Sequence, residues 1–470
     1  MRRWWPFLFI LLLCLPAVSP YLGGDIPRSN DSLSHLYRAF QLARLVRAGI
    51  FFPRWAPDLA HGYGYPIFNY FAYLSHYLIV LFYLIGLPLL SALRASYIVA
   101  LIASGLTAYI FARDLAGGDD RAGLVAAVAY VYSPYVLYTA HVRGGLPENL
   151  ALVFLPLALW AVRRALRIHH EGAKELYAGP EIPRACPERS RRVARNDIPK
   201  LRQNPEGLNF LVELRDLVSS WFNSPTAIYA LIAALAIAGF ITAHAGMALQ
   251  YLPLIGLFGL YVIFSHTPTP PHRLGFWLLG FGVLSLIFTL ALALTVFLWL
   301  PTLTDLAYVQ YQIAFARSGA TYTNNFFYLG ELFAYPRLPV FTDVLNPPLV
   351  RSLPLLASAL AVLGLFRQTL RVSQTDYLFV FGLFALTSFL ILDLSKPVWD
   401  NSSLLQRSVL PWRFLGPASL FASTLAGLAV GDWTLRVEIR DWTPEVRREV
   451  GSWKLGFGIL ELACCSRAVP

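Results

Sequence analysis

Long apolar runs alternate with short polar segments along most of the chain. A helix that crosses a bilayer needs about 20 mostly apolar residues. The first such run extends from Trp4 to about Leu22, and later ones lie near 93–112, 122–140, 149–167, 225–243, 247–264, 275–300, 351–367, 376–393 and 411–430. This pattern predicts an all-α, polytopic integral membrane protein with about 10–11 transmembrane helices.

The orientation of the chain follows from its basic residues. The first run is preceded by Arg2 and Arg3 and lacks a clean small-x-small cleavage site, so we expect an uncleaved signal anchor with a cytoplasmic N-terminus. The apolar run at 67–90 is interrupted near its end by glycine and proline. If that run does not cross, the arginines at 163–167 fall on the cytoplasmic side, as the positive-inside bias favours. We therefore expect 67–90 to be re-entrant or to lie at the membrane surface.

This topology predicts a linear division of the chain. The predicted segments are 1–22, a signal-anchor helix; 23–92, a first outer loop with amphipathic and re-entrant or interfacial helices; 93–167, transmembrane helices; 168–224, a polar, disordered cytoplasmic insert; 225–300, transmembrane helices; 301–350, an outer loop; 351–431, transmembrane helices; and 432–470, a cytoplasmic tail that ends abruptly and suggests truncation.

Composition supports a membrane protein and narrows its partners. The chain is 57% hydrophobic and 14% charged, whereas a soluble protein carries about 25% charged residues. The net charge of +11 indicates cytoplasmic-face Lys and Arg and contact with membrane lipids, because no nucleic-acid-binding motif accompanies it. The four cysteines match neither a disulfide framework nor a metal-binding spacing.

The first outer loop contains a helical pattern with two faces. Asp31, His35 and Arg38 lie on one side of this pattern, and the apolar positions on the other side are Leu33, Leu36, Tyr37, Phe40 and Ala43. Asp31 then has two interpretations. It is an N-cap of the helix, or it is a carboxylate at the membrane surface whose pKa His35 tunes or whose proton His35 shares.

The same loop contains Pro53-Arg54-Trp55 and a Gly-Tyr-Gly-Tyr-Pro string that begins at Gly62. Glycines permit close backbone approach, and Trp and Tyr favour the membrane interface, so both strings are first of all scaffold. Arg54 is equally a candidate phosphate ligand, since a guanidinium matches phosphate oxygens in a bidentate geometry.

A second polar segment, 141–149, lies between two predicted spans and contains Arg143 and Glu148. An acidic residue at membrane depth is costly and is by default a functional hypothesis. The structural alternatives are an ion pair between Arg143 and Glu148, or a stabilising acid at a helix N-terminus.

Three further candidates lie near the ends of later spans. His244 is either an ordinary loop histidine or a substrate contact, and it stands between two closely linked runs. Arg407 and Arg413 flank a basic and aromatic string that fits a lipid phosphate or interface anchoring about equally well.

Together these strings resemble bacterial membrane proteins described as containing a 6-pyruvoyl-tetrahydropterin synthase-related domain. The resemblance covers most of residues 1–430 outside 170–222 and rests on Asp31…His35…Arg38, Gly49…Pro53-Arg54-Trp55, Gly62-Tyr63-Gly64-Tyr65-Pro66, Arg143-Gly144…Glu148, His244 and Pro411-Trp412-Arg413-Phe414. It does not imply tetrahydropterin chemistry, because that zinc site uses closely spaced histidines and His61-Gly62-Tyr63 lacks the second one.

The layout is similar to that of GT-C glycosyltransferases, and this resemblance implies a function. It implies a polyprenyl-phosphate sugar as donor, an acceptor at the outer face of the bacterial cytoplasmic membrane, and a first-loop acid at the position of Asp31. The candidate catalytic residues are Asp31, His35 and Glu148, and the candidate substrate- or phosphate-binding residues are Arg54, Arg143, His244 and Arg413.

Two questions stay open at this point. No Asp-x-Asp or Asp-Glu pair occurs at Asp31, so dependence on a divalent metal is undecided. The alternative function is a non-catalytic transporter or assembly protein for lipid-linked substrates on the same scaffold. Charges gathered at one face favour the enzyme, because a transporter would distribute them along a path.

Overall fold

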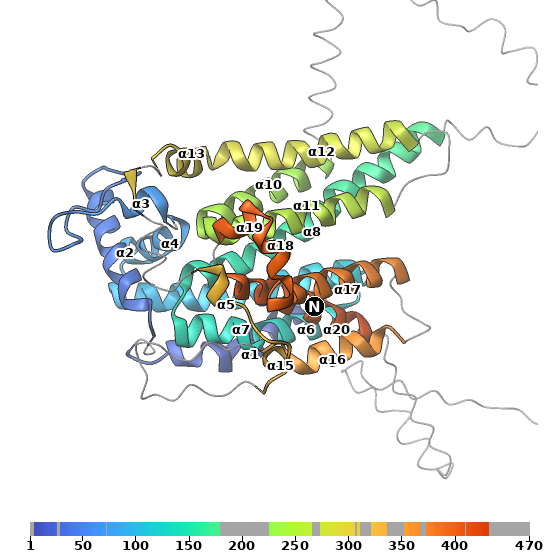
Figure 1. The fold of residues 1–470 in the computed structure, drawn as a ribbon, viewed down its shortest axis with the longest axis horizontal. Coiled ribbons are helices and arrows are strands. Elements are labelled where there is room, and N and C mark those ends of the chain that lie inside the picture. The colour runs from blue at the N-terminus through green and yellow to red at the C-terminus, as the bar shows by residue number, and fades with distance from the viewer. Residues whose placement is uncertain are drawn as a thin grey trace, which may run out of the picture.

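The computed structural model describes residues 4–25, 29–71, 73–178, 225–265, 273–305, 308–310, 321–335, 352–366, 373–408 and 410–431. Within these ranges the chain forms helices and no strand, with two isolated β-bridges. Most of the long helices run side by side (Figure 1). The predicted all-α class is confirmed for the described part of the chain.

Six described helices are long and apolar enough to cross a membrane, and a seventh span is added if one bent pair is counted as a single crossing. The bent pair joins α6 (Asp120–Val131) to the segment Pro134–Arg143 at 47°. The six helices are α5 (Leu89–Leu115), α8 (Leu146–Ala178), α10 (Pro225–Ala243), α11 (Ala245–Ser265), α12 (Arg273–Leu294) and α20 (Leu415–Gly431). The chain is therefore a helical protein with multi-pass membrane character.

Three predicted spans correspond to shorter helices. The α1 helix (Trp5–Val18) has 14 residues, α16 (Leu355–Gly364) has 10, and α17 (Gln374–Phe389) has 16. At about 1.5 Å per residue, α16 reaches about 15 Å and α17 about 24 Å, against an apolar bilayer thickness of about 30 Å. The apolar runs at these positions continue past the helix ends, which is why the sequence suggested more spans than the described helices provide.

The segment predicted as the first outer loop (23–92), here called the first outer region, forms short helices at one end of the bundle. Helices α2 (Ser32–Arg47), α3 (Ile67–Tyr70) and α4 (Tyr73–Leu84) gather there, near α13 (Val296–Thr304) (Figure 1). The 12 residues of α4 extend only about 18 Å, which is too short to cross a bilayer. The chain then turns at Gly86, whose φ is 109°, before α5 begins.

The α2 helix presents its apolar stripe outward. Leu33, Tyr37 and Phe40 are 56%, 58% and 43% exposed, whereas His35 on the opposite face is 2% exposed. The buried face is mixed, because His35 shares it with Ala39, Leu42 and Ala43, the last of which the pattern had placed in the apolar stripe. An outward apolar stripe is the arrangement of a helix that borders lipid.

Small residues allow α20 to occupy the centre of the bundle. It packs against α6, α16 and α17, and most of its residues are alanine, serine, glycine or leucine and are buried. A Cβ atom at Gly427 would collide with the carbonyl oxygen of Ala122. Small residues let helix backbones approach this closely in the absence of water.

At the opposite end of the bundle, ion pairs of the buried Asp114 carboxylate connect α5 to α8. Asp114, which is 7% exposed, lies at the C-terminal end of α5. Its carboxylate pairs with Arg163 and Arg164 of α8, and Arg163 also donates to the Asp114 carbonyl oxygen at 3.1 Å. The arginines that guided the topology therefore also connect two spans.

Two segments assigned to the outer face pack against each other. The Phe327 N–H donates to the Ile391 carbonyl oxygen at 3.0 Å, and the Tyr322 ring stacks on Trp399. The short elements in these segments are η4 (Tyr322–Asn324), α15 (Leu329–Leu332), η5 (Asp393–Ser395), α18 (Lys396–Asp400) and α19 (Ser403–Ser408).

The boundary of the predicted insert differs from the structure. We expected polar, disordered chain from residue 168, but α8 continues as a helix to Ala178. The rest of the predicted insert and the predicted tail at 432–470 lie outside the described residues.

Candidate functional site

The buried carboxylate of Glu148 lies close to side chains from separate parts of the chain. Glu148, in the first turn of α8, is 2% exposed. Its Oε2 accepts a hydrogen bond from Arg143 Nη1 at 2.6 Å, and its Oε1 accepts one from Arg413 Nε at 3.1 Å. His244 Nε2 lies 3.6 Å from the same Oε1 atom. We call Arg143, Glu148, His244 and Arg413 the Glu148 cluster.

The neighbours of His244 define its protonation. Its Nδ1 accepts a hydrogen bond from the Met247 backbone N–H at 3.2 Å, and its Nε2 lies 3.4 Å from Arg413 Nη2 and 3.6 Å from Glu148 Oε1. Burial and the nearby Arg413 lower the pKa of His244, although Glu148 opposes this shift. The imidazole is therefore neutral at pH 7.

Both arginines of the cluster lie close to an indole ring. The Arg143 guanidinium carbon lies 4.7 Å from the Trp412 ring centroid, and that of Arg413 lies 5.8 Å away. A cation over an indole face is favourable by about 0.5–2 kcal/mol. Trp412 was not among the predicted site residues, although it is adjacent to Arg413 in the string that drew attention to that arginine.

An irregular helix end positions Arg143. The helix α7 (Pro134–Leu137) continues into the π-helical segment η2 (Tyr138–Arg143), which ends at Gly144 with φ of 66°. The Tyr97 hydroxyl donates to the Gly144 carbonyl oxygen at 2.6 Å, and the Tyr21 hydroxyl donates to the Ala140 carbonyl oxygen at 2.6 Å. Single π-turns of this kind are frequent at functional sites.

The absence of a side chain at Gly144 brings the first outer region close to this turn. A Cβ atom at Gly144 would collide with the hydroxyls of Ser29 and Ser32. The Asp31 backbone N–H donates to the Arg143 carbonyl oxygen at 2.9 Å. The loop that carries Asp31 is therefore tied to the backbone that carries Arg143.

The side chain of Asp31 faces Arg143. Its Oδ2 is 3.9 Å from Arg143 Nε, and the side chain is 44% exposed. Asp31 stands at the N-cap position of α2, but its side chain makes no capping hydrogen bond, so the capping interpretation is not what the structure shows. Burial raises the pKa of Asp31, while Arg143 and Arg38 act in the opposite direction.

His35 lies in a different environment from Asp31. Its Nδ1 is 3.3 Å from His76 Nε2 of α4, and its ring is nearly parallel to Phe71 at 6.3 Å. The buried Nε2 of His35 has no hydrogen-bond partner among the described residues. The structure thus pairs His35 with His76, which the sequence analysis missed because it stands within an apolar run.

This buried imidazole leads to a prediction about pH. Burial, His76 and Arg38 lower the pKa of His35 well below 6.5, so the folded protein binds fewer protons than the unfolded chain below that pH. Stability is then full above about pH 6.5 and falls as the pH decreases below it, by up to about 1.4 kcal/mol per pH unit for one such group. Thermal unfolding of the purified protein between about pH 7 and pH 5 should show this loss.

The variant His35→Asn should show a shallower fall over the same pH range, because it removes one group that takes up a proton on unfolding. An equally steep fall in this variant would assign the effect to other groups, among them His244.

Arg54 lies apart from the Glu148 cluster. It is exposed, and its Nη1 is 3.4 Å from the Asn69 side-chain oxygen. Asn69 Nδ2 in turn donates to Asp305 Oδ2 at 3.1 Å. A Cβ at Gly64 would collide with the Trp55 ring, so the neighbouring glycine and aromatic strings serve as scaffold here. Arg54 therefore belongs to a hydrogen-bonded chain that joins the first outer region to the end of α13.

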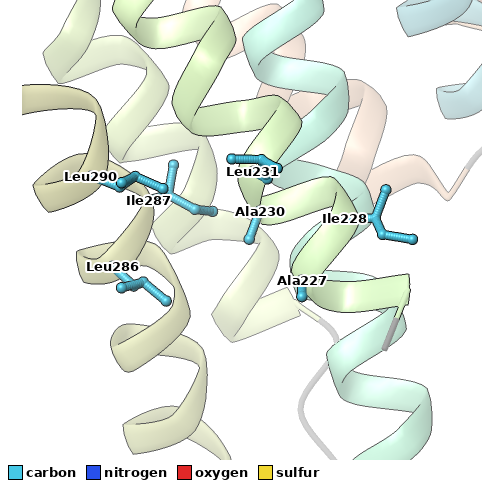
Figure 2. Close-up of a pocket in the computed structure, with 7 residues that line it drawn as sticks. All are labelled: Ala227, Ile228, Ala230, Leu231, Leu286, Ile287 and Leu290. Atoms are coloured by element: carbon cyan, nitrogen blue, oxygen red, sulfur yellow. The ribbon is translucent and has the colours of Figure 1, made fainter. Parts of the chain in front are cut away.

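Apolar hollows occur elsewhere on the bundle. A groove of about 130 Å³ between α10 and α12 is lined only by aliphatic side chains (Figure 2). A larger cavity of about 660 Å³ lies among α1, α6, α16 and α20, and its lining includes Leu13, Tyr132, Pro134 and Leu353. Neither hollow is lined by a residue of the Glu148 cluster.

Among the described residues, no group of three His, Cys, Asp or Glu side chains could hold a metal ion. No family model, curated protein or solved structure matches this chain. The candidate site therefore consists of Asp31, which faces Arg143, and of the other members of the Glu148 cluster: Glu148, His244 and Arg413.

Proposed function

We propose that this chain is a GT-C-like membrane glycosyltransferase. It would move a sugar from a polyprenyl-phosphate donor to an acceptor at the outer face of a bacterial cytoplasmic membrane. The observation that supports this most is the partly exposed Asp31 carboxylate, held 3.9 Å from Arg143 where several helix ends meet. A carboxylate that is reachable from water beside fixed cations suits proton abstraction next to a developing anion.

The proposed reaction needs one base and one stabilised leaving group. Asp31 takes the proton of an acceptor hydroxyl, whose oxygen forms a bond to the anomeric carbon of the donor sugar. The bond between that carbon and the phosphate oxygen breaks, and the lipid phosphate leaves with the electron pair. Cationic side chains offset its charge, and Arg143 and Arg413 are the predicted candidates that lie in the site.

Glu148 acts in this proposal as a positioning residue. Both of its oxygens accept hydrogen bonds from arginines, and it is 2% exposed. A carboxylate held in this way fixes Arg143 and Arg413 and is not free to take a proton from a substrate. His244 Nε2 lies 3.6 Å from the same carboxylate.

The large apolar cavity is a suitable place for part of the lipid tail. It has a volume of about 660 Å³, and its lining is dominated by aliphatic side chains. One of its lining residues, Pro134, begins the helix that leads through η2 to Arg143. The cavity and the charged site are therefore connected through one short segment of chain.

A binding experiment tests this function directly. The purified full chain in detergent is heated with a polyprenyl-phosphate sugar, and in parallel with a nucleotide sugar. We expect the lipid-linked sugar to raise the unfolding temperature, since a ligand at about 100 times its Kd adds about 2.7 kcal/mol. Stabilisation by the nucleotide sugar alone would contradict the proposal. Stabilisation by the lipid-linked sugar without transfer would support the non-catalytic alternative.

A further inference from the structure

Arg38, in the first outer region, has no hydrogen-bond acceptor among the described residues. Arg38 stands on α2, is half-buried, and its guanidinium carbon lies 4.7 Å from the Phe71 ring centroid. It makes neither a hydrogen bond nor an ion pair with any described residue. A guanidinium has five N–H donors, and partial burial without an acceptor is costly. The position therefore suits an anion supplied from outside the protein.

The charges around Arg38 leave an excess of positive charge. Glu148 is engaged by Arg143 and Arg413, and Asp31 is nearest to Arg143. Among the buried histidines, His35 and His244 are neutral because their surroundings disfavour the charged form. Three arginines against two carboxylates leave one positive charge among these residues. An anion bound at Arg38 would balance it.

Arg38 stands further along α2 than Asp31, the proposed base. Asp31 and Arg38 are seven residues apart, which corresponds to about two turns or about 10 Å along α2. Side chains on a helix lean toward its N-terminus, so Arg38 extends back toward Asp31. A direct displacement places the attacking hydroxyl and the departing phosphate on opposite sides of the anomeric carbon. Arg143 is next to the base, whereas Arg38 stands about two turns further along α2.

We propose that Arg38 is the residue that binds the phosphate of the lipid-linked donor. This inference rests on the proposed function and deepens it by assigning a ligand to one side chain. Two phosphate oxygens fit the guanidinium in a bidentate arrangement. The Phe71 ring lies against the same guanidinium. Arg143 and Arg413, whose donors face Glu148, add positive potential without being the direct ligand.

The test uses a short lipid phosphate and two matched probes. Binding of farnesyl phosphate, farnesol and inorganic phosphate to the purified full chain is measured by calorimetric titration. The variant is Arg38→Gln, and the control is Arg44→Gln on the same helix, where the exposed arginine already pairs with Asp58. We expect farnesyl phosphate to bind at least tenfold more weakly to Arg38→Gln and normally to Arg44→Gln.

The other probes separate phosphate recognition from general damage. Farnesol should bind equally to wild type and Arg38→Gln, and inorganic phosphate should compete with farnesyl phosphate in the wild type only. Arg38→Lys should recover part of the affinity, because a point charge replaces a bidentate donor. Unchanged farnesyl phosphate binding in Arg38→Gln, or an equal loss of farnesol binding, would overturn the assignment.

The same measurements distinguish this inference from the proposed function. If phosphate binding depends on Arg38 but the protein transfers no sugar, the phosphate site is supported and the proposed glycosyltransferase function is contradicted. Sugar transfer that depends on Asp31, together with phosphate binding that is indifferent to Arg38, would overturn this inference alone.

Discussion

The variant Glu148→Gln is expected to lower the free energy of unfolding by about 3–5 kcal/mol, the usual effect of removing one partner from a buried ion pair. The change leaves Arg143 and Arg413 without the carboxylate that both of them contact, in a place where Glu148 is 2% exposed. Thermal or denaturant unfolding of the purified protein in detergent measures the loss.

A matched control and a double variant sharpen this prediction. Asp58→Asn removes an exposed ion pair with Arg44, and a surface pair contributes at most about 1 kcal/mol. The double variant Glu148→Gln with Arg413→Gln should recover part of the loss, because one buried charge is removed with its partner. A wild-type unfolding midpoint in Glu148→Gln would show that the arginines do not depend on this carboxylate.

The variant Gly427→Ala is expected to destabilise the protein by about 1–3 kcal/mol, the typical effect of overpacking a close contact. Its new methyl group would meet the carbonyl oxygen of Ala122 on α6. A backbone atom cannot rotate aside as a flexible side chain can. The two helices must therefore separate, and thermal unfolding detects the change.

Gly382→Ala provides the control on another apolar helix. Gly382 of α17 has no atom within 4 Å of the place where a Cβ would stand. Alanine is favoured over glycine within a helix by about 0.5–1 kcal/mol, so this variant should be at least as stable as the wild type. Equal effects of the two substitutions would argue against a close approach of α20 and α6.

The sequence predicted the helical class because hydrophobicity is local and periodic. Runs near 93–112, 149–167 and 225–243 became helices with closely similar bounds. The runs at 351–367 and 376–393 did not become full-length spans, since apolar composition marks which residues avoid water but not where a helix ends. Helix α16 begins only after Pro354, and α17 ends at Phe389, so both helices are shorter than the apolar runs.

The candidate site was predicted as a set of residues, but not as a set of contacts. Four candidates, Arg143, Glu148, His244 and Arg413, meet directly although they are far apart in the sequence. A single sequence shows which residue types are unusual at membrane depth, and that was sufficient to select them. It does not show that Glu148 and Arg413 are neighbours.

The first outer region shows the limits of periodicity most clearly. The helical pattern placed Asp31, His35 and Arg38 on one face, yet each has a different partner: Arg143, His76 and Phe71. Spacing along a helix defines a face but not what that face touches. For the same reason the two interpretations of Asp31 could be separated only by its side-chain contacts.

Transfer of sugar by the variant Asp31→Asn tests the central claim most directly. Membranes containing wild type, Asp31→Asn or the nearby control Asp58→Asn receive a radiolabelled polyprenyl-phosphate sugar, and the label that reaches the acceptor fraction is counted at equal protein abundance. Loss of a general base reduces the rate by about 10²–10⁴-fold. We predict this loss in Asp31→Asn alone, and undiminished transfer in that variant would contradict the assignment of Asp31 as the base.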